Sequence, residues 1–197
     1  YSYSTLKSSP TLTNCVFIGN TAKQYSRYAG GGGGMVNQNG SPVLINCVFS
    51  GNTATQKGGG MDNYIGSPVL FNCVFSGNTA TQGHGGGLTS RDGSPVLTNC
   101  VFTGNSASRS GGGWFDQGTL KNTIFHKNTS VSDHADLFAS EVSHCLVSGG
   151  YSGTRNLDGV PLFVNVHDPD GPDDKWFTED DGLRLMEGSP AIDAGHN

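Results

Sequence analysis

The sequence predicts an all-β protein, a right-handed parallel β-helix (solenoid) of roughly seven coils. One pattern recurs along the chain, short apolar runs alternate with turn residues, and glycine is abundant, with 31 in 197 residues. The clearest copies of the repeat cover residues 9–22, 41–54, 67–80 and 94–107, and weaker copies cover 118–129 and 141–150. Units this short cannot bury a hydrophobic face alone, so they must stack as coils of parallel strands.

We expect three parts along the chain: an N-terminal arm over residues 1–8, β-helix repeats over 9–150, and C-terminal coils with an acidic loop over 151–197. The arm alternates like a strand. In each repeat, the first short run carries a leucine that recurs without change, so we expect these leucines to face inward. They are Leu12, Leu44, Leu70, Leu97 and Leu120.

An asparagine follows this first run in each repeat, and we expect it at a bend. Stacked amides at a bend can hydrogen-bond from coil to coil and satisfy backbone groups that the turn leaves unpaired. A functional role for these amides is the alternative. The column consists of Asn14, Asn46, Asn72, Asn99 and Asn122.

Beyond the bend, cysteine and phenylalanine occupy alternate positions, which puts both on one face of a strand. We assign that face to the core, so the valines between them form an apolar stripe on the outside that something must cover. The reverse alternation, with valines inside and thiols exposed, remains open. The columns are Cys15, Cys47, Cys73 and Cys100; Phe17, Phe49, Phe75, Phe102 and Phe125; and Val16, Val48, Val74 and Val101.

The five cysteines include no C-x-x-C pair, so zinc-ligand spacing and thioredoxin-like chemistry are unsupported. Cysteines stacked at about 4.8 Å are within disulfide range, but in-register side chains point in parallel. We therefore expect a ladder of reduced, buried thiols that pack as small hydrophobic groups.

An acidic segment near the C-terminus is a candidate calcium site, and calcium is the one cofactor that we expect. Carboxylates around a glycine turn offer the hard oxygen ligands that Ca²⁺ accepts in irregular loops. A plain solvated acidic loop is the alternative. The candidate ligands are Asp168, Asp170, Asp173, Asp174, Glu179 and Asp181. A separate sequon makes Asn128 a candidate for glycosylation.

The charge pattern argues against two classes of partner. The formal net charge is −5 and the basic residues are scattered, so the footprint of a nucleic-acid binder is missing. No run of 18 apolar residues occurs, so we expect no membrane insertion.

Two motifs in the repeat carry a family resemblance. Phe-x-x-Asn begins at Phe17, Phe49, Phe75, Phe102 and Phe125, and a Gly-Gly-Gly-apolar step ends at Met35, Met61, Leu88 and Trp114. This pairing resembles the repeat of chlamydial polymorphic outer-membrane proteins. That family's step is usually Gly-Gly-Ala-aliphatic, so the third glycine is a departure.

The end of the chain carries a second resemblance. The run from Ser189 through Pro190, Ala191 and Ile192 to Gly195 is similar to the closing coils of bacterial secreted β-helix proteins called choice-of-anchor Q proteins. Both resemblances imply a secreted, extracellular or cell-surface protein with a role in adhesion or surface structure. Neither implies catalytic residues.

The function that we expect is structural. The ends of a solenoid are open sheet edges, and the sequence shows no amphipathic capping helix. We therefore expect subunits to stack head to tail into a surface filament or adhesive fibre, with the protein itself as partner and host or environmental glycans as further partners. The expected contacts are the arm residues Tyr1, Tyr3 and Leu6 and the valine stripe.

A polysaccharide lyase or glycosidase is the alternative, since such enzymes need carboxylates that converge on one outer face. Asp62, Asp92 and Asp116 lie near the glycine steps, but they occupy different columns, which indicates turn chemistry. We therefore expect no enzyme activity. A passive carbohydrate-binding module, with Tyr25, Tyr28, Tyr64 and Tyr151 as stacking platforms, is a third reading.

Overall fold

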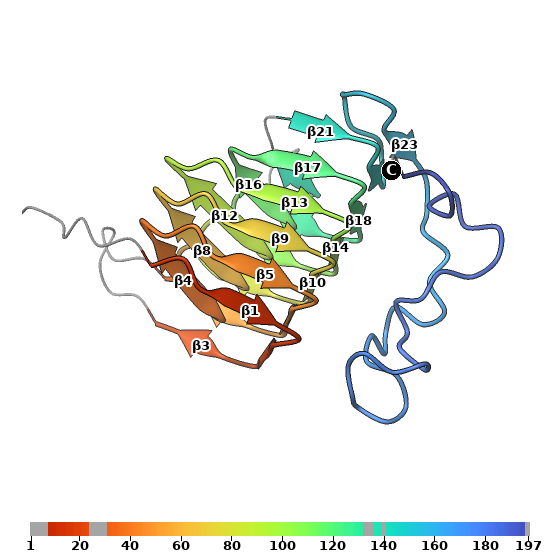
Figure 1. Ribbon diagram of the computed structural model, residues 1–197, viewed down its shortest axis with the longest axis horizontal. Coiled ribbons are helices and arrows are strands. Elements are labelled where there is room, and N and C mark those ends of the chain that lie inside the picture. Colours follow the sequence, from red (N-terminus) through yellow and green to blue (C-terminus); the bar gives the residue numbers. More distant parts are fainter. Residues whose placement is uncertain (1–7, 24–30, 132–135, 139–140, 196–197) are drawn as a thin grey trace, which may run out of the picture.

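The computed structural model describes residues 8–23, 31–131, 136–138 and 141–195 (Figure 1). These residues form short strands that all pair in parallel with the equivalent strand of the next coil. The structure thus confirms an all-β parallel β-helix. Within the described ranges, no helix is long and apolar enough to span a lipid bilayer.

Four sheets run along the solenoid axis. The first sheet contains β1 (Thr11–Thr13), β5 (Val43–Ile45), β9 (Val69–Phe71), β13 (Val96–Thr98), β17 (Thr119–Lys121) and β21 (Glu141–Ser143). The second contains β2 (Val16–Ile18), β6 (Val48–Ser50), β10 (Val74–Ser76), β14 (Val101–Thr103), β18 (Ile124–His126), β22 (Leu146–Val147) and β23 (Leu157–Asp158).

The two remaining sheets follow the Phe-x-x-Asn motif and the glycine step. The third contains β3 (Thr21–Ala22), β7 (Thr53–Ala54), β11 (Thr79–Ala80), β15 (Ser106–Ala107) and β19 (Thr129–Ser130). The fourth contains β4 (Met35–Gln38), β8 (Met61–Tyr64), β12 (Leu88–Arg91), β16 (Trp114–Asp116) and β20 (Leu137–Phe138).

The number of coils is smaller than the sequence indicates. Among the described residues, only the second sheet reaches seven strands, while the third and fourth have five each. The expected seven coils are therefore an overestimate. The weak copy of the repeat near residue 141 supplies β21 and β22, but no described strand of the third or fourth sheet follows them.

Register places identical side chains directly above one another. Leu12 pairs with Leu44, and Phe17 pairs with Phe49. The stacked phenylalanine rings lie 4.6 to 4.9 Å apart between centroids and within 9° of parallel. The Trp114 ring meets Phe102 edge-on at 6.3 Å. The leucine, cysteine and phenylalanine columns form one buried core, as expected from their alternation.

The valine column is not an open stripe. Val16 in the first coil is 43% exposed, but Val48 is fully buried. Other outward positions of the second sheet are buried as well, namely Ser76, Thr103 and His126. In Figure 1 the chain beyond β23 runs down the side of the coil where β10, β14 and β18 lie. Val74 and Val101 are half-buried, so this segment covers the predicted stripe only in part, and the role of the stripe as a contact between subunits stays a prediction.

This covering segment, residues 159–195, departs from the C-terminal coils that the sequence led us to expect. Its described residues form turns and one antiparallel bridge, Phe163 to Leu185. It attaches where Phe163 meets the His126 ring edge-on at 6.2 Å and where the Gly159 carbonyl accepts a hydrogen bond from Ser148 Oγ. The attachment is thus made to β18 and to the turn after β22.

A turn over residues 148–158 closes part of the C-terminal end of the coil. Tyr151 packs against the core there. Asn156 accepts a hydrogen bond from the Cys145 backbone N–H at 3.0 Å and donates to the Val142 carbonyl at 3.1 Å. This end therefore has a cap, built from a turn instead of the amphipathic helix that the sequence lacks.

Candidate functional surfaces

The glycine steps bring the chain of one coil against the next. A Cβ built on Gly59 would lie 2.3 Å from the Gly86 carbonyl oxygen. At the third glycine of the same step, a Cβ on Gly60 would lie 2.6 Å from the Gly87 carbonyl oxygen and 2.9 Å from the Phe75 ring. The packed phenylalanine column therefore requires the third glycine, the position where this repeat departs from Gly-Gly-Ala.

The asparagines at the predicted bend adopt left-handed backbone conformations, with φ between 50° and 56°. Their amides connect coils at the N-terminal end of the column. Asn46 Nδ2 donates to Asn14 Oδ1 at 3.2 Å, and Asn72 Nδ2 donates to Asn46 Oδ1 at 3.3 Å. His144 continues the column with φ 53°. We call this row of residues the corner column.

A second asparagine ladder lies inside the coil, and sequence reasoning missed its role. The asparagines that close each Phe-x-x-Asn motif are buried from the second coil onward. Asn78 Oδ1 accepts hydrogen bonds from both the backbone and the side-chain nitrogen of Asn52 at 3.0 Å, and Asn78 Nδ2 donates to the Phe49 carbonyl at 2.8 Å. The ladder contains Asn20, Asn52, Asn78, Asn105 and Asn128.

The last rung of this inner ladder corrects the expected glycosylation site. Asn128 is only 4% exposed, and its Nδ2 donates to the Phe102 carbonyl at 2.9 Å and to Asp136 Oδ1 at 2.7 Å. The folded structure leaves no place for a glycan on this nitrogen. Burial raises the pKa of the Asp136 carboxyl above its ordinary value.

The five cysteines are free thiols, and all except Cys15 are buried. Each donates to backbone carbonyls, as when Cys73 Sγ donates to the Phe71 carbonyl at 3.4 Å. The hydrogen bond with Cys100 raises the pKa of Cys73 to about 12, and burial raises the pKa of Cys145 to about 11. Thiols held this far from ionisation are poor nucleophiles and poor metal ligands.

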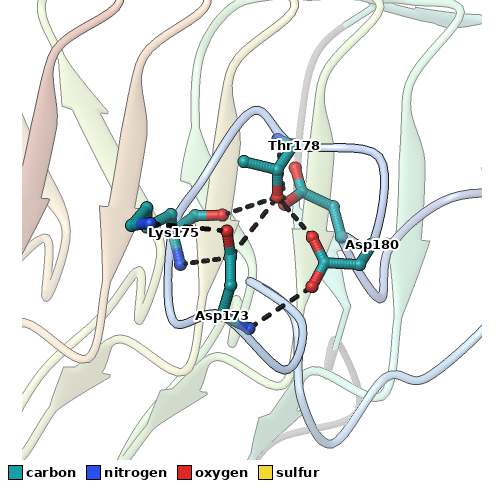
Figure 2. A network of polar contacts seen from close by, with 5 residues as sticks. Asp173, Lys175, Thr178 and Asp180 are labelled. Carbon is teal, nitrogen blue, oxygen red and sulfur yellow. Dashed lines mark hydrogen bonds and ion pairs between the residues drawn. The ribbon is translucent and has the colours of Figure 1, made fainter.

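The acidic loop uses its carboxylates mainly to accept hydrogen bonds from its own chain (Figure 2). Asp173 Oδ1 accepts from the Lys175 N–H at 2.9 Å, and Asp180 Oδ1 accepts from Thr178 Oγ1 at 2.6 Å. Asp181 Oδ2 accepts from the Phe177 N–H at 2.9 Å, and Lys175 Nζ lies 3.8 Å from Asp173. The hydrogen bond from Thr178 lowers the pKa of Asp180.

The candidate calcium ligands do not converge in this arrangement. Across the described residues, no group of three or more His, Cys, Asp or Glu side chains is placed to hold a metal ion. Asp168 lines a small hollow of about 270 Å³ together with Asp180 and Arg184. Asp170, Asp174 and Glu179 belong to the same loop without a shared centre.

The three aspartates near the glycine steps do not form one cluster among the described residues. Asp62 is buried and accepts hydrogen bonds from Thr89 Oγ1 at 2.8 Å and from the Gly31 N–H at 3.1 Å. Asp92 is exposed, 3.8 Å from Arg91. Asp116 sits one column over from Asp62, at φ 95°, and burial raises its pKa.

The aromatic candidates for sugar binding are placed as follows. Tyr64 lies under the Arg91 guanidinium at 4.4 Å, and Tyr151 packs on the core. Tyr25 and Tyr28, together with the arm residues Tyr1, Tyr3 and Leu6, lie outside the described residues.

The two ends of the coil differ in how completely the core is buried there. In the first coil, the core residues Leu12, Cys15, Phe17 and Met35 are only partly buried, whereas their equivalents one coil further are fully buried. At the other end, the turn over 148–158 covers the first and second sheets, while β19 and β20 are the outermost described strands of the third and fourth.

A family model matches a short segment of the chain. The Chlamydia polymorphic membrane protein (Chlamydia_PMP) repeat matches residues 46–60, which run from the corner asparagine of one coil through β6 and β7 to the glycine step. No curated protein and no solved structure matches the chain. The matched segment and the parallel solenoid together support a β-helix similar to those of the polymorphic membrane proteins, and the resemblance of the C-terminal segment to choice-of-anchor Q proteins stays a prediction.

Proposed function

We propose that the chain is an extracellular, non-catalytic structural β-helix whose copies stack end to end into a surface filament or adhesive fibre. The observation that carries the proposal is the first coil, where Leu12, Phe17 and Met35 remain partly exposed on the outermost described strands of the four sheets, β1 to β4. A second strand layer placed on these strands would bury the side chains and pair the backbone groups.

The opposite end offers an unlike surface, as head-to-tail stacking requires. Among the described residues, no further strand pairs with the outer edges of β19 and β20. The 148–158 turn covers only the first and second sheets, so this end of the coil is uneven. A heterologous contact between two unlike ends repeats without closing, so it builds a filament. The match to a polymorphic membrane protein repeat supports a cell-surface location for such a structure.

The test is self-association of the full chain, measured by sedimentation velocity over a wide concentration range. We expect Phe17→Asp to abolish assembly, because it places a charge on the partly exposed core of the first coil. Phe71→Asp is the matched control, since Phe71 is 39% exposed on the outer face of β9, inside the first sheet and away from both ends of the coil. Its assembly should equal that of the wild type.

Two results would overturn the proposal. One is a wild-type protein that stays monomeric at every concentration. The other is equal assembly by Phe17→Asp and wild type, provided that circular dichroism shows the variant to be folded. If Phe17→Asp does not fold, Leu12→Lys at the same edge takes its place.

A further inference from the structure

A groove runs along the solenoid between the corner column and the covering segment. Its volume is about 560 Å³. One wall is formed by Asn99, Asn122 and His144 of the corner column, and the other by Leu185, Ala191 and residues 193–195. In Figure 1 the C-terminal end of the chain returns to the coil beside β18 and β23, where this second wall lies. The groove thus spans three successive coils.

The groove begins where the hydrogen bonds of the corner column stop. The amides of Asn14, Asn46 and Asn72 are joined to one another, but within the described ranges no hydrogen bond involves the side chain of Asn99. Asn99 is exposed at the bend, with its backbone fixed at φ 56°. Its amide therefore presents a donor and an acceptor to a ligand lying in the groove.

The floor and the opposite wall complete a surface of mixed character. Val101, Ile124 and Leu146 form an apolar floor, and Leu185 extends it onto the covering segment. Asp193 supplies the only formal charge among the lining residues. Its exposed carboxylate faces a groove without lysine or arginine, in a chain with net charge −5. This charge disfavours an anionic ligand.

We infer that this groove binds a segment of a neutral polysaccharide. Sugar hydroxyls both donate and accept, which matches amides and a carboxylate, and the C–H faces of sugar rings match the apolar floor. A peptide would bind best by adding a strand, but β14 and β18 are already paired on both sides. The inference is independent of end-to-end stacking, because the groove lies on the side of the coil.

The experiment is an NMR titration of the full chain with neutral hexasaccharides of glucose, mannose, galactose and N-acetylglucosamine, with a hexauronate, and with an unstructured peptide. We expect a neutral hexasaccharide to bind the wild type and Asn99→Ala to weaken it about fivefold, the effect of losing one net hydrogen bond. Asn46→Ala is the matched control, since it removes the same side chain from the same column outside the groove. Its affinity should equal that of the wild type.

A charge variant adds an independent readout. Asp193→Asn keeps the size of the side chain and removes the carboxylate, so we expect the hexauronate to gain affinity relative to the neutral sugars. The inference is overturned if no neutral hexasaccharide shifts the wild-type spectrum, if Asn99→Ala and Asn46→Ala weaken binding equally, or if the hexauronate or an unstructured peptide binds the wild-type groove better.

Discussion

Single side chains explain why the Phe-x-x-Asn motif repeats so strictly. In the middle rungs of the inner ladder, as at Asn78, the amide oxygen accepts hydrogen bonds from the asparagine of the preceding coil. The amide nitrogen donates to the phenylalanine carbonyl of that coil and to the asparagine of the next coil. A buried amide with all its bonds made rigidifies the coil, and losing it leaves backbone groups unpaired in the core.

We predict that Asn78→Ala lowers the free energy of unfolding by about 3 kcal/mol, because it leaves the buried Asn52 N–H without a partner and removes the side-chain hydrogen bonds to the Phe49 carbonyl and to Asn105. Asn72→Gly is the control, since glycine keeps the left-handed conformation and only a surface bond is lost. It should cost less than about 1 kcal/mol. Urea denaturation measures both, and equal losses would contradict the assignment of an inner ladder.

Asp136 accepts hydrogen bonds from Asn128 at the end of the inner ladder, and its carboxyl makes the stability of the fold depend on pH. Burial raises the pKa of the Asp136 carboxyl in the folded state above its unfolded value of about 4. The stabilisation that this carboxyl gives the folded state is therefore complete below the unfolded pKa, and it is lost as the pH rises through the folded-state pKa. We predict that wild type loses stability relative to Asp136→Asn as the pH rises over this range. Thermal unfolding of the two proteins from pH 3 to 7 checks it, and a difference that does not change with pH would contradict it.

At the scale of strands and turns, some parts of the fold could be predicted from the sequence. The invariant leucines and the alternation of Cys47 with Phe49 predicted the inward faces, because stacked coils place like residues in columns. The position of the asparagines at the bend could be predicted because few residues other than glycine adopt positive φ readily.

Other elements could not be predicted from local pattern. The inner asparagines follow phenylalanine by three residues, and neither propensity nor alternation says whether such a polar residue turns inward to the core. The covering segment has no periodicity, so its contact with His126 through Phe163 depends on tertiary structure alone. For the same reason, the groove beside Asn99, with one wall taken from Ala191 and residues 193–195, has no signature in the sequence.

The glycine step makes its own prediction. Gly60→Ala would place a methyl group 2.6 Å from the Gly87 carbonyl oxygen, so neighbouring coils must move apart. We expect a loss of about 1–3 kcal/mol in the free energy of unfolding, the usual cost of overpacking. Gly51→Asn is the control, because a side chain there meets nothing within 4 Å and asparagine tolerates its φ of 61°. Chemical denaturation that gives equal stability for both variants would contradict the close approach of the coils.

The folded chain is a short rod whose two ends differ. The covering segment attaches to the second sheet at His126 and to the turn after β22, and the turn over 148–158 closes part of one end. The partly exposed core of the first coil is the remaining feature that a structural role must use. This asymmetry favours growth along one axis over side-by-side aggregation.

Electron microscopy of the concentrated wild-type protein is the most direct measurement of end-to-end stacking. The proposal predicts unbranched filaments one rod wide, with an axial repeat equal to the length of one folded β-helix. It also predicts that Phe17→Asp yields only isolated rods. Isolated rods from the wild type at the highest attainable concentration, or rods joined along their sides, would contradict it.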